Sequence, residues 1–260
     1  MDSNLLKNEL TEDGVAFGGF MQIGHPAVAE IFARAGLRWV IIDLEHGITD
    51  LETAAGLMRA MSGGSCQALV RLPTNDPTWI ARCLDAGAHG VVVPMVNTVQ
   101  QAKAAVDAVK YPPAGKRGFG YGRANHYGVD FDDYAATANQ NLVVIVQIEH
   151  VDGVENIDQI LQVEHIDGIF VGPYDLSGSM DIVGQMDHPK MISALDQISQ
   201  ACTRHAMPAG LHIVQPDLAR LRDALDRGFR IFALSADSVL LYAGMRDLLM
   251  RAREIIDAAG

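Results

Sequence analysis

The sequence predicts an α/β fold, and within that class it favours a (β/α)8 TIM barrel formed by residues 1–260 as a single domain. Short apolar runs rich in β-branched residues alternate with amphipathic stretches along the chain, as in parallel strands joined by helices. About eight such units follow one another without a linker-like segment, and 260 residues is a usual length for one closed barrel. An open, doubly wound sheet is the alternative, although no G-x-G-x-x-G motif follows the first run.

The strands are expected where the apolar runs lie, because a strand buried on both faces is continuously apolar. These runs cover residues 15–21, 39–43, 67–71, 90–94, 142–148, 168–171, 209–213 and 231–234. Helices are expected between them, for example over residues 26–35, 77–86 and 216–226. Each of these three begins with proline, which suits the first helical turn because its missing N–H has no partner there.

Two segments depart from a minimal barrel. Residues 111–130 form a Gly- and Tyr-rich insert before the fifth strand, and long loops of this kind usually act as lids or contact loops. Its cations could bind a phosphate or a long anionic acceptor; they are Lys116, Arg117 and Arg123. Residues 238–258 predict a long C-terminal amphipathic helix with a broad apolar face. This helix either closes the barrel or is exchanged with a neighbouring subunit.

The composition argues against several classes of function. A formal charge of −12 disfavours nucleic acid and anionic membrane surfaces as partners, because either needs a basic face. No apolar stretch approaches the roughly 18 residues of a membrane span, and residues 1–14 contain no apolar core of a signal peptide. The three cysteines form no CxxC motif, which is typical of a reduced protein. We therefore expect a cytoplasmic enzyme that acts on small molecules.

Two acids follow apolar runs at the predicted carboxyl-terminal rim of the sheet. Glu149 comes directly after Ile148, and Asp175 ends the turn Gly172-Pro173-Tyr174-Asp175. Ligands of α/β folds bind at this rim, and hard cations such as Mg²⁺ or Mn²⁺ often use only one or two protein carboxylates. The pair therefore predicts a divalent metal site. For each acid alone, capping of the next helix or pairing with an arginine is the alternative.

Other polar residues follow neighbouring strands. His46 can act as a general acid or base near neutral pH, and Arg71 can stabilise an oxyanion such as an enolate. Asp85 could orient His46 only from a neighbouring turn or subunit, because it lies at an expected helix end. Backbone N–H groups of the turn at residues 172–177 could hold a substrate carboxylate. His212 follows the seventh strand and Gln147 lies near the end of the fifth.

The lysines argue against one class of aldolase. A Schiff-base aldolase needs a lysine inside the barrel, and none of the five lysines follows a predicted strand. These lysines are Lys7, Lys103, Lys110, Lys116 and Lys190. A bound metal is therefore the expected electron sink.

The chain resembles the class II, metal-dependent pyruvate aldolases of the HpcH/HpaI family over nearly its whole length. Six motifs carry the resemblance, and only their combination is specific. They are Ile-Asp-x-Glu-His at 42–46, Val-Arg at 70–71, Val-Pro-Met-Val at 93–96, Tyr-Pro-Pro-Ala-Gly-x-Arg-Gly at 111–118, Val-Gln-Ile-Glu at 146–149 and Gly-Pro-x-Asp-Leu-Ser at 172–177.

The resemblance implies a barrel of the phosphoenolpyruvate/pyruvate type that assembles as a homo-oligomer, a trimer or hexamer. It also implies that Glu149 and Asp175 bind Mg²⁺, Mn²⁺ or Co²⁺, which pyruvate would chelate. The backbone at Tyr174 and Asp175, within the turn that begins at Gly172 and Pro173, would receive the substrate carboxylate.

The resemblance further implies roles for the remaining candidates. Arg71 would contact the 2-oxo group and stabilise the enolate. His46, supported by Asp85, would move the proton, and Gln147 would shape the site. His212 stands where the family more often has an apolar residue, so it could line the acceptor pocket, as could the unusual insert.

The expected function is that of a carbon–carbon lyase, an aldolase that forms or cleaves 4-hydroxy-2-oxo acids through a pyruvate enolate and an aldehyde acceptor. Two alternatives stay open. One is a metal-dependent, citrate synthase-like enzyme that condenses oxaloacetate with an acetyl-CoA thioester, as in siderophore pathways. The other is a catalytically silent, metabolite-binding barrel, against which the presence of His46, Arg71, Glu149 and Asp175 argues.

Overall fold

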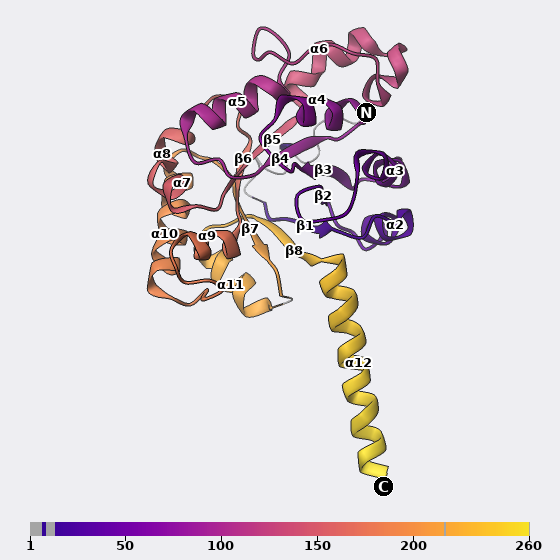
Figure 1. The fold of residues 1–260 in the computed structure, drawn as a ribbon, viewed down its shortest axis with the longest axis vertical. Helices are drawn as coiled ribbons and strands as arrows, with labels where there is room; N and C mark the ends of the chain where they lie inside the picture. The colour runs from indigo at the N-terminus through magenta and orange to yellow at the C-terminus, as the bar shows by residue number, and fades with distance from the viewer. Residues whose placement is uncertain (1–6, 9–13, 216, 260) are drawn as a thin grey trace.

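The computed structural model describes residues 7–8, 14–215 and 217–259, and these residues form a closed barrel of parallel strands surrounded by helices (Figure 1). Eight strands pair in chain order from β1 to β8, and β8 closes the barrel by pairing with β1. The predicted (β/α)8 TIM barrel is therefore confirmed, and the doubly wound alternative is wrong.

The strands lie close to their predicted positions. They are β1 (Ala16–Met21), β2 (Trp39–Asp43), β3 (Gln67–Arg71), β4 (Gly90–Val93), β5 (Val143–Ile148), β6 (Gly168–Val171), β7 (Ala209–Ile213) and β8 (Ile231–Ala236). Four of them match the predicted bounds, and the other four differ by one or two residues at one end. Strand β4 ends before Pro94, which has no N–H to donate to a neighbouring strand.

The helices fill the connections between the strands. They are α2 (Pro26–Arg34), α3 (Leu51–Met61), α4 (Pro77–Asp85), α5 (Val99–Val109), the 3₁₀ helix η1 (Arg123–Gly128), α6 (Phe131–Asn141), α7 (Val151–Glu155), α8 (Ile157–Ile160), α9 (Pro173–Ser179), α10 (Pro189–Arg204), α11 (Leu218–Asp226) and α12 (Asp237–Ala259). Proline begins α2 and α4 as predicted. The predicted start of α11 at Pro216 lies outside the described residues, and Asp217 caps that helix.

The core has two layers. One cluster lies between the strands and the outer helices, and a second cluster fills the barrel interior. In the interior, the Trp39 and Phe170 rings occupy space that a side chain at Gly18 or Gly210 would need. The filled interior is a solid floor, as in other barrels of this kind. A ligand therefore cannot bind inside the barrel itself.

The insert at residues 111–130 lies at the amino-terminal rim of the barrel, because it follows the end of α5 and leads through α6 to the start of β5. Arg117 anchors it: the guanidinium is buried, forms a 2.6 Å ion pair with Asp85 and lies 4.7 Å from the centre of the Tyr111 ring. The insert also contains η1. The insert therefore contains regular structure and lies away from the carboxyl ends of this chain's own strands, and its expected role as a lid or contact loop stays a prediction.

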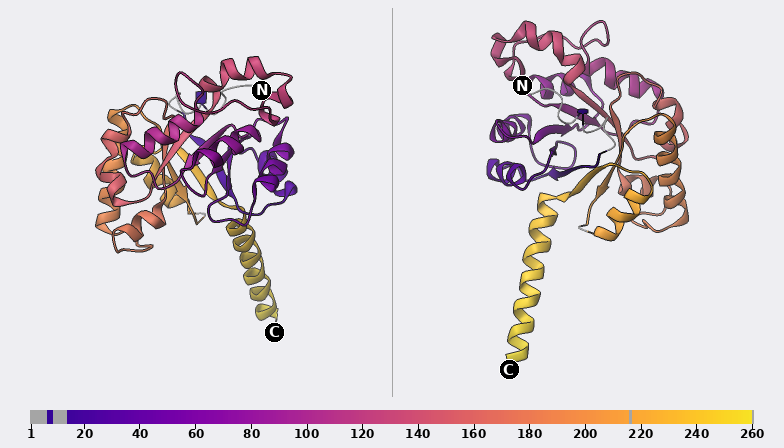
Figure 2. Two further views of the ribbon diagram at one scale, coloured as in Figure 1. Left: turned by 45° about the horizontal axis from the view of Figure 1, so that its top comes forward. Right: turned by 180° about the vertical axis from the view of Figure 1, so that it is seen from behind.

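Helix α12 extends away from the barrel, as Figures 1 and 2 show. It confirms the predicted long C-terminal helix and is slightly longer than predicted. Large apolar side chains are exposed along its length; they are Leu240, Leu241, Tyr242, Met245, Leu248, Leu249, Met250, Ile255 and Ile256. Among the described residues, no helix is both long and apolar enough to cross a membrane.

Candidate active site

A layer of polar side chains lies on top of the apolar barrel interior, at the carboxyl ends of the strands. Successive residues of a strand point to opposite faces. Each residue of the polar layer lies two positions after an inward-facing residue of the barrel interior on the same strand. It therefore also points into the barrel. The layer consists of Asp43 on β2, Arg71 on β3, Gln147 on β5 and His212 on β7.

The centre of this layer is an ion pair between Arg71 and Asp43. Arg71 Nε donates to Asp43 Oδ1 at 2.9 Å, and Arg71 Nη2 donates to Oδ2 at 2.7 Å. Burial would raise the pKa of Asp43, but hydrogen bonds and charge from Arg71 hold it below its usual value. The guanidinium also lies 4.7 Å from the centre of the Phe20 ring. This two-point contact fixes the plane of the guanidinium, as paired donors and acceptors do.

Asp43 is in turn held by Gln22, just after β1, and Gln22 is positioned by Asp237 at the start of α12. Gln22 Nε2 donates to Asp43 Oδ2 at 3.2 Å, and Asp237 accepts the backbone N–H groups of Gln22 and Ile23, each at 2.9 Å. Sequence reasoning gave no role to Asp43, Gln22 or Asp237. The available signal for Asp43 was an acid that ends an apolar strand, close to the signal that identified Glu149, an acid directly after one.

Glu45 and His46 lie on the turn that Asp43 organises. Asp43 Oδ1 accepts the backbone N–H groups of both residues, at 3.1 and 3.3 Å. Glu45 Oε2 lies 3.2 Å from Arg71 Nη1 and 3.9 Å from His46 Nε2. Burial raises the pKa of Glu45 to about 6, although the charge of Arg71 opposes the rise. The His46 side chain is 56% exposed, so it can exchange protons with a ligand or solvent at the mouth of the site.

Glu149 is buried beside Gln147 and accepts hydrogen bonds from two directions. The backbone N–H of Met95 donates to Glu149 Oε1 at 2.7 Å, and Gln147 Nε2 donates to Oε2. Burial raises the pKa of Glu149, and the nearby Asp175 charge adds to the rise. A Cβ at Gly172 would come within 2.5 Å of Glu149 Oε2. Only glycine leaves room for the carboxylate at this position.

The donor set around Glu149 fits a hard divalent cation. Gln147 Oε1 is buried without a hydrogen-bond partner among the described residues, and Asp175 lies in the first turn of α9. Two carboxylates and an amide oxygen are the ligand types that Mg²⁺ and Mn²⁺ prefer. Within the described ranges, no three His, Cys, Asp or Glu side chains cluster closely enough to hold a metal. Substrate and water would therefore have to complete the coordination.

The turn before α9 is built as the sequence predicted. Gly172 donates its N–H to Ile148 O at 3.3 Å, and α9 begins at Pro173. Tyr174 and Asp175 thus fall in the first helical turn, where backbone N–H groups have no partner within the helix. A cavity of about 390 Å³ lies beside the end of β7 and is lined by Pro173, Tyr174 and His212. The Tyr174 side chain is half-exposed.

His212 points into the barrel, and its ring centre lies 4.4 Å from that of Phe20. Burial lowers its pKa to about 4, and the positive charge of Arg71 contributes to this shift. Its Nε2 atom is buried and has no hydrogen-bond partner among the described residues. The imidazole is therefore neutral at physiological pH, and one of its polar atoms is unsatisfied.

Comparison with known proteins gives the family. The model of the protein family described as HpcH/HpaI aldolase/citrate lyase matches residues 17–243 of this chain. The chain belongs to this family. Its suspected resemblance to these enzymes is therefore confirmed.

Three relatives illustrate the similarity. A 4-hydroxy-2-oxovalerate aldolase of Novosphingobium aromaticivorans is 38% identical, over 99% of this chain and 97% of its own. A hydroxypyruvate/pyruvate aldolase of Roseobacter denitrificans is 36% identical, over 92% and 93% of the two chains. The crystal structure of citrate synthase SbnG superposes with a TM-score of 0.87 and 29% identity, over 97% of this chain and 98% of that one.

Asp85 is the one predicted catalytic residue of this HpcH/HpaI family member that lies away from the others. It is the last residue of α4, which runs from the carboxyl-terminal rim back to the amino-terminal rim. There its carboxylate pairs with Arg117. Within one chain, Asp85 and His46 therefore lie at opposite ends of the barrel.

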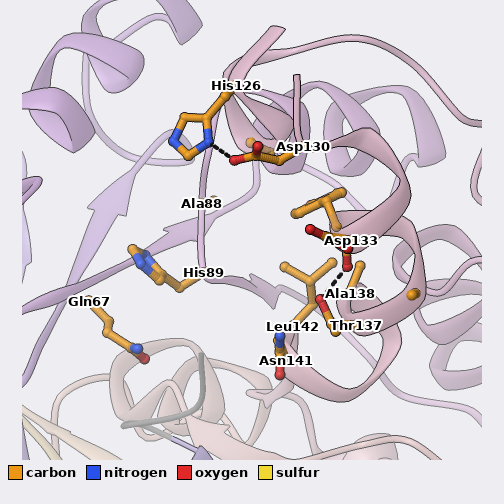
Figure 3. A pocket seen from close by; sticks show the side chains of 13 residues that line it. Gln67, Ala88, His89, His126, Asp130, Asp133, Thr137, Ala138, Asn141 and Leu142 are labelled. Carbon is orange, nitrogen blue, oxygen red and sulfur yellow. Dashed lines mark hydrogen bonds and ion pairs between the residues drawn. The ribbon is translucent and has the colours of Figure 1, made fainter. Parts of the chain in front are cut away.

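A second cavity, of about 400 Å³, also lies away from the polar layer, between β4 and α6 (Figure 3). His89 and Gln67 contribute to its wall, and His126 pairs with Asp130 at its edge. His89 Nδ1 accepts the backbone N–H of Ala68 at 3.2 Å. Because these residues precede or begin strands, the cavity belongs to the amino-terminal rim.

Proposed function

We propose that the chain is a divalent-metal-dependent aldolase, a carbon–carbon lyase that forms or cleaves 4-hydroxy-2-oxo acids. The observation that carries the proposal is one rim that combines a fixed cation, Arg71, with the buried carboxylate of Glu149 and with Asp175. Family membership and the aldolases among the relatives support it.

Glu149 and Asp175 are the residues that would hold the metal, and Gln147 Oε1, which has no partner among the described residues, would add a third oxygen. When bound, a divalent cation acts as a Lewis acid toward the 2-oxo acid. The buried setting strengthens such electrostatic effects because little water competes. The first-turn amides of Tyr174 and Asp175 would bind the substrate carboxylate.

Arg71 would stabilise the enolate. Its guanidinium is already oriented by Asp43, so little reorganisation is needed when negative charge develops on the 2-oxo oxygen. Arginine stays protonated at any working pH. The positive charge is therefore available throughout the reaction.

His46 would move the proton between substrate and solvent. It stands at the mouth of the site beside Glu45 and is partly exposed. Asp85 can support it only from a second copy of the chain, because within one chain the two residues lie at opposite rims.

We propose a homo-oligomer, a trimer or hexamer, in which the apolar side of α12 packs on a neighbouring subunit. An isolated helix with so many exposed large apolar side chains is unusual for a monomer. The same assembly would bring Asp85 and the insert of one chain near the catalytic rim of another. The buried, unpaired cysteines support a reducing, cytoplasmic setting; they are Cys66, Cys83 and Cys202.

A citrate synthase-like condensation is the second candidate, favoured by the similarity to the citrate synthase structure. It would use oxaloacetate and an acetyl thioester and would release a thiol. A silent, metabolite-binding barrel is less well supported, because the paired Arg71 and the buried Glu149 are costly to keep without a ligand.

The deciding experiment follows the methyl protons of pyruvate by NMR in D₂O, with enzyme and Mg²⁺, and with EDTA as the control. Metal-dependent exchange would support enolate formation without any knowledge of the aldehyde. An absence of exchange would contradict the aldolase proposal. Thiol release from acetyl-CoA and oxaloacetate would then distinguish the condensing enzyme from a silent barrel.

A further inference from the structure

The barrel closes at the seam between β1 and β8, and the residues just after these two strands are bonded to each other. Asp237 Oδ1 accepts the backbone N–H of Gln22, and Asp237 Oδ2 accepts that of Ile23, each at 2.9 Å. Asp237 Oδ1 also accepts the N–H of Ser238 at 2.8 Å. The carboxylate is buried. Backbone N–H groups therefore fasten the start of α12 to the end of β1.

Strand β8 is distorted directly before this contact. Gly18 on β1 lies opposite Ala233. Two residues later Phe20 lies opposite Ala236, so β8 has one extra residue over this stretch. Within it, Ser235 has a φ of 65°. A residue other than glycine is strained in this left-handed region, and such strain and such bulges are common beside functional sites.

The side chain of Gln22 continues the contact from α12 to the polar layer. Its Nε2 donates to Asp43 Oδ2 at 3.2 Å, and Ser238 Oγ donates to its Oε1 at 2.9 Å. The reversed amide would place its oxygen against the carboxylate of Asp43, where no hydrogen bond can form. The hydroxyl of Ser238 therefore supports the one orientation in which Gln22 donates to Asp43.

Asp43 needs this donor because both of its oxygens hold Arg71. Each carboxylate oxygen offers about two acceptor positions. Oδ2 uses one for Arg71 Nη2, at 2.7 Å, and another for Gln22, while Oδ1 accepts from Arg71 Nε at 2.9 Å. Rotation of the carboxylate about its Cβ–Cγ bond would break the two-point contact with the guanidinium. Gln22 opposes that rotation, because it occupies the second position on Oδ2.

We propose that Gln22 is a positioning residue for Arg71 and that Asp237 and Ser238, at the base of α12, hold Gln22 in place. The effect on turnover rests on the proposed aldolase function. The contacts from Ser238 through Gln22 and Asp43 to Arg71 form a relay, and through it the seat of α12 sets the orientation of the guanidinium. A cation that must reorient as charge develops stabilises an enolate less. Loss of the relay therefore lowers kcat and leaves the metal ligands untouched.

The first test follows exchange of the pyruvate methyl protons in D₂O with Mg²⁺ for the full-length protein. Gln22→Met has a similar length but no donor. It should lower kcat about tenfold and keep KM within about twofold, because it removes a hydrogen bond to a charged group but no substrate contact. The affinity for Mn²⁺, measured by calorimetry without substrate, should not change. Gln200→Met, the same substitution at an exposed position of α10, should behave as the wild type.

Two substitutions of Ser238 separate the relay from a merely structural contact. Ser238→Ala removes the hydroxyl and should lower kcat about threefold, whereas Ser238→Thr keeps the hydroxyl and should stay within about twofold of the wild type. Because Ser238 acts through Gln22, adding Ser238→Ala to Gln22→Met should lower kcat no further. A residue that only stabilised the start of α12 would lower kcat by the same factor in both backgrounds.

A second measurement needs neither metal nor substrate. In the metal-free protein labelled with ¹⁵N-arginine, the Nε–H signal of Arg71 is identified by its loss in Arg71→Lys. NMR then measures the rate at which this hydrogen exchanges with water. A buried two-point contact protects the hydrogen, so the rate should rise about tenfold in Gln22→Met.

Three results would overturn the inference. One is an unchanged kcat or an unchanged Nε–H exchange rate in Gln22→Met. Another is an equal loss of kcat in Ser238→Thr and Ser238→Ala, and the third is an additive loss in the double variant. If Gln22→Met does not fold, the two Ser238 variants still decide. A wild type that exchanges no pyruvate protons would contradict the proposed function, whereas the Nε–H measurement would still support or overturn the relay.

Discussion

Asp43 holds both Nε and Nη2 of Arg71, at 2.9 and 2.7 Å, in a contact buried at the centre of the polar layer. The two residues lie 28 positions apart in the sequence and meet only because β2 and β3 are neighbours with Asp43 opposite Arg71 in register. This contact gives the cation a fixed orientation before any substrate binds.

Substitution Asp43→Asn should lower turnover about 10- to 100-fold, because the neutral amide no longer fixes the guanidinium by two charge-assisted bonds. It should also lower the free energy of unfolding by about 3 kcal/mol, since a buried charge loses its partner. Exchange of the pyruvate methyl protons in D₂O measures the change in turnover, and urea denaturation measures the change in the free energy of unfolding. Asp50→Asn is the matched control: Asp50 caps α3 through the Thr53 N–H, so exchange should not change. Equal effects in both variants would contradict the assigned role of Asp43.

Substitution Glu149→Gln should abolish metal-dependent exchange, because the amide cannot replace a buried carboxylate ligand. Calorimetric titration with Mn²⁺ should show affinity lowered about 100-fold. Glu155→Gln, at an exposed position at the end of α7, should behave as the wild type. Full activity of Glu149→Gln in metal-free buffer would rule out the metal site.

Substitution Gly172→Ala should weaken Mn²⁺ binding about tenfold or more, because the added Cβ would lie 2.5 Å from Glu149 Oε2 and must displace it. Gly178→Ala, in the helix α9 that follows Gly172, meets only Val183 at 4.0 Å. It should leave binding intact and stabilise the protein by about 0.5–1 kcal/mol. The prediction fails if both alanine variants bind the metal equally well.

Stability should fall as the pH is lowered from about 6.5 toward 4, in part because of His212. Its pKa in the folded protein is about 4, below the usual 6.5, so the unfolded chain binds the proton more readily in this range. Above pH 6.5 His212 is neutral in both states and does not lower the free energy of unfolding. At pH 5 it lowers that free energy by about 2 kcal/mol. Urea denaturation at pH 7 and pH 5 checks it. His212→Gln should lose correspondingly less stability on acidification, and an identical loss in both proteins would contradict the assignment.

Substitution Leu248→Asp should convert the oligomer into smaller species, because it places a charge on the exposed apolar side of α12. Light scattering coupled to size exclusion measures the mass. Arg253→Gln, an exposed polar position on the same helix, should leave the mass unchanged. A monomeric wild type would contradict the proposed assembly. If Asp85 acts across subunits, Leu248→Asp should lower the exchange of the pyruvate methyl protons together with the mass of the oligomer.

Much of the barrel could be predicted because its signals are local. The apolar runs of β2, β3, β6 and β7 match their predicted bounds, since burial on both faces keeps most of their residues apolar. Glu149 and Asp175 could be assigned to one rim because all strands of a parallel barrel end at the same side.

The site was less predictable wherever a role depends on a partner far along the chain. The structure shows that Asp43 pairs with Arg71, whereas the sequence showed only an acid at a strand end. Asp85 could be expected beside His46 from family resemblance, yet a helix that returns to the opposite rim separates them within one chain.

The sequence by itself determined the eight strand-and-helix units, the family and the side of the barrel where chemistry takes place. All of these follow from residue periodicity and short motifs. The tertiary structure alone decided which groups are satisfied: Arg71 has its partner, while Nε2 of His212 has none within the part of the chain that the structure describes. The physical reason is that hydrogen bonding and burial depend on distances between strands, which closure of the barrel sets and no local pattern encodes.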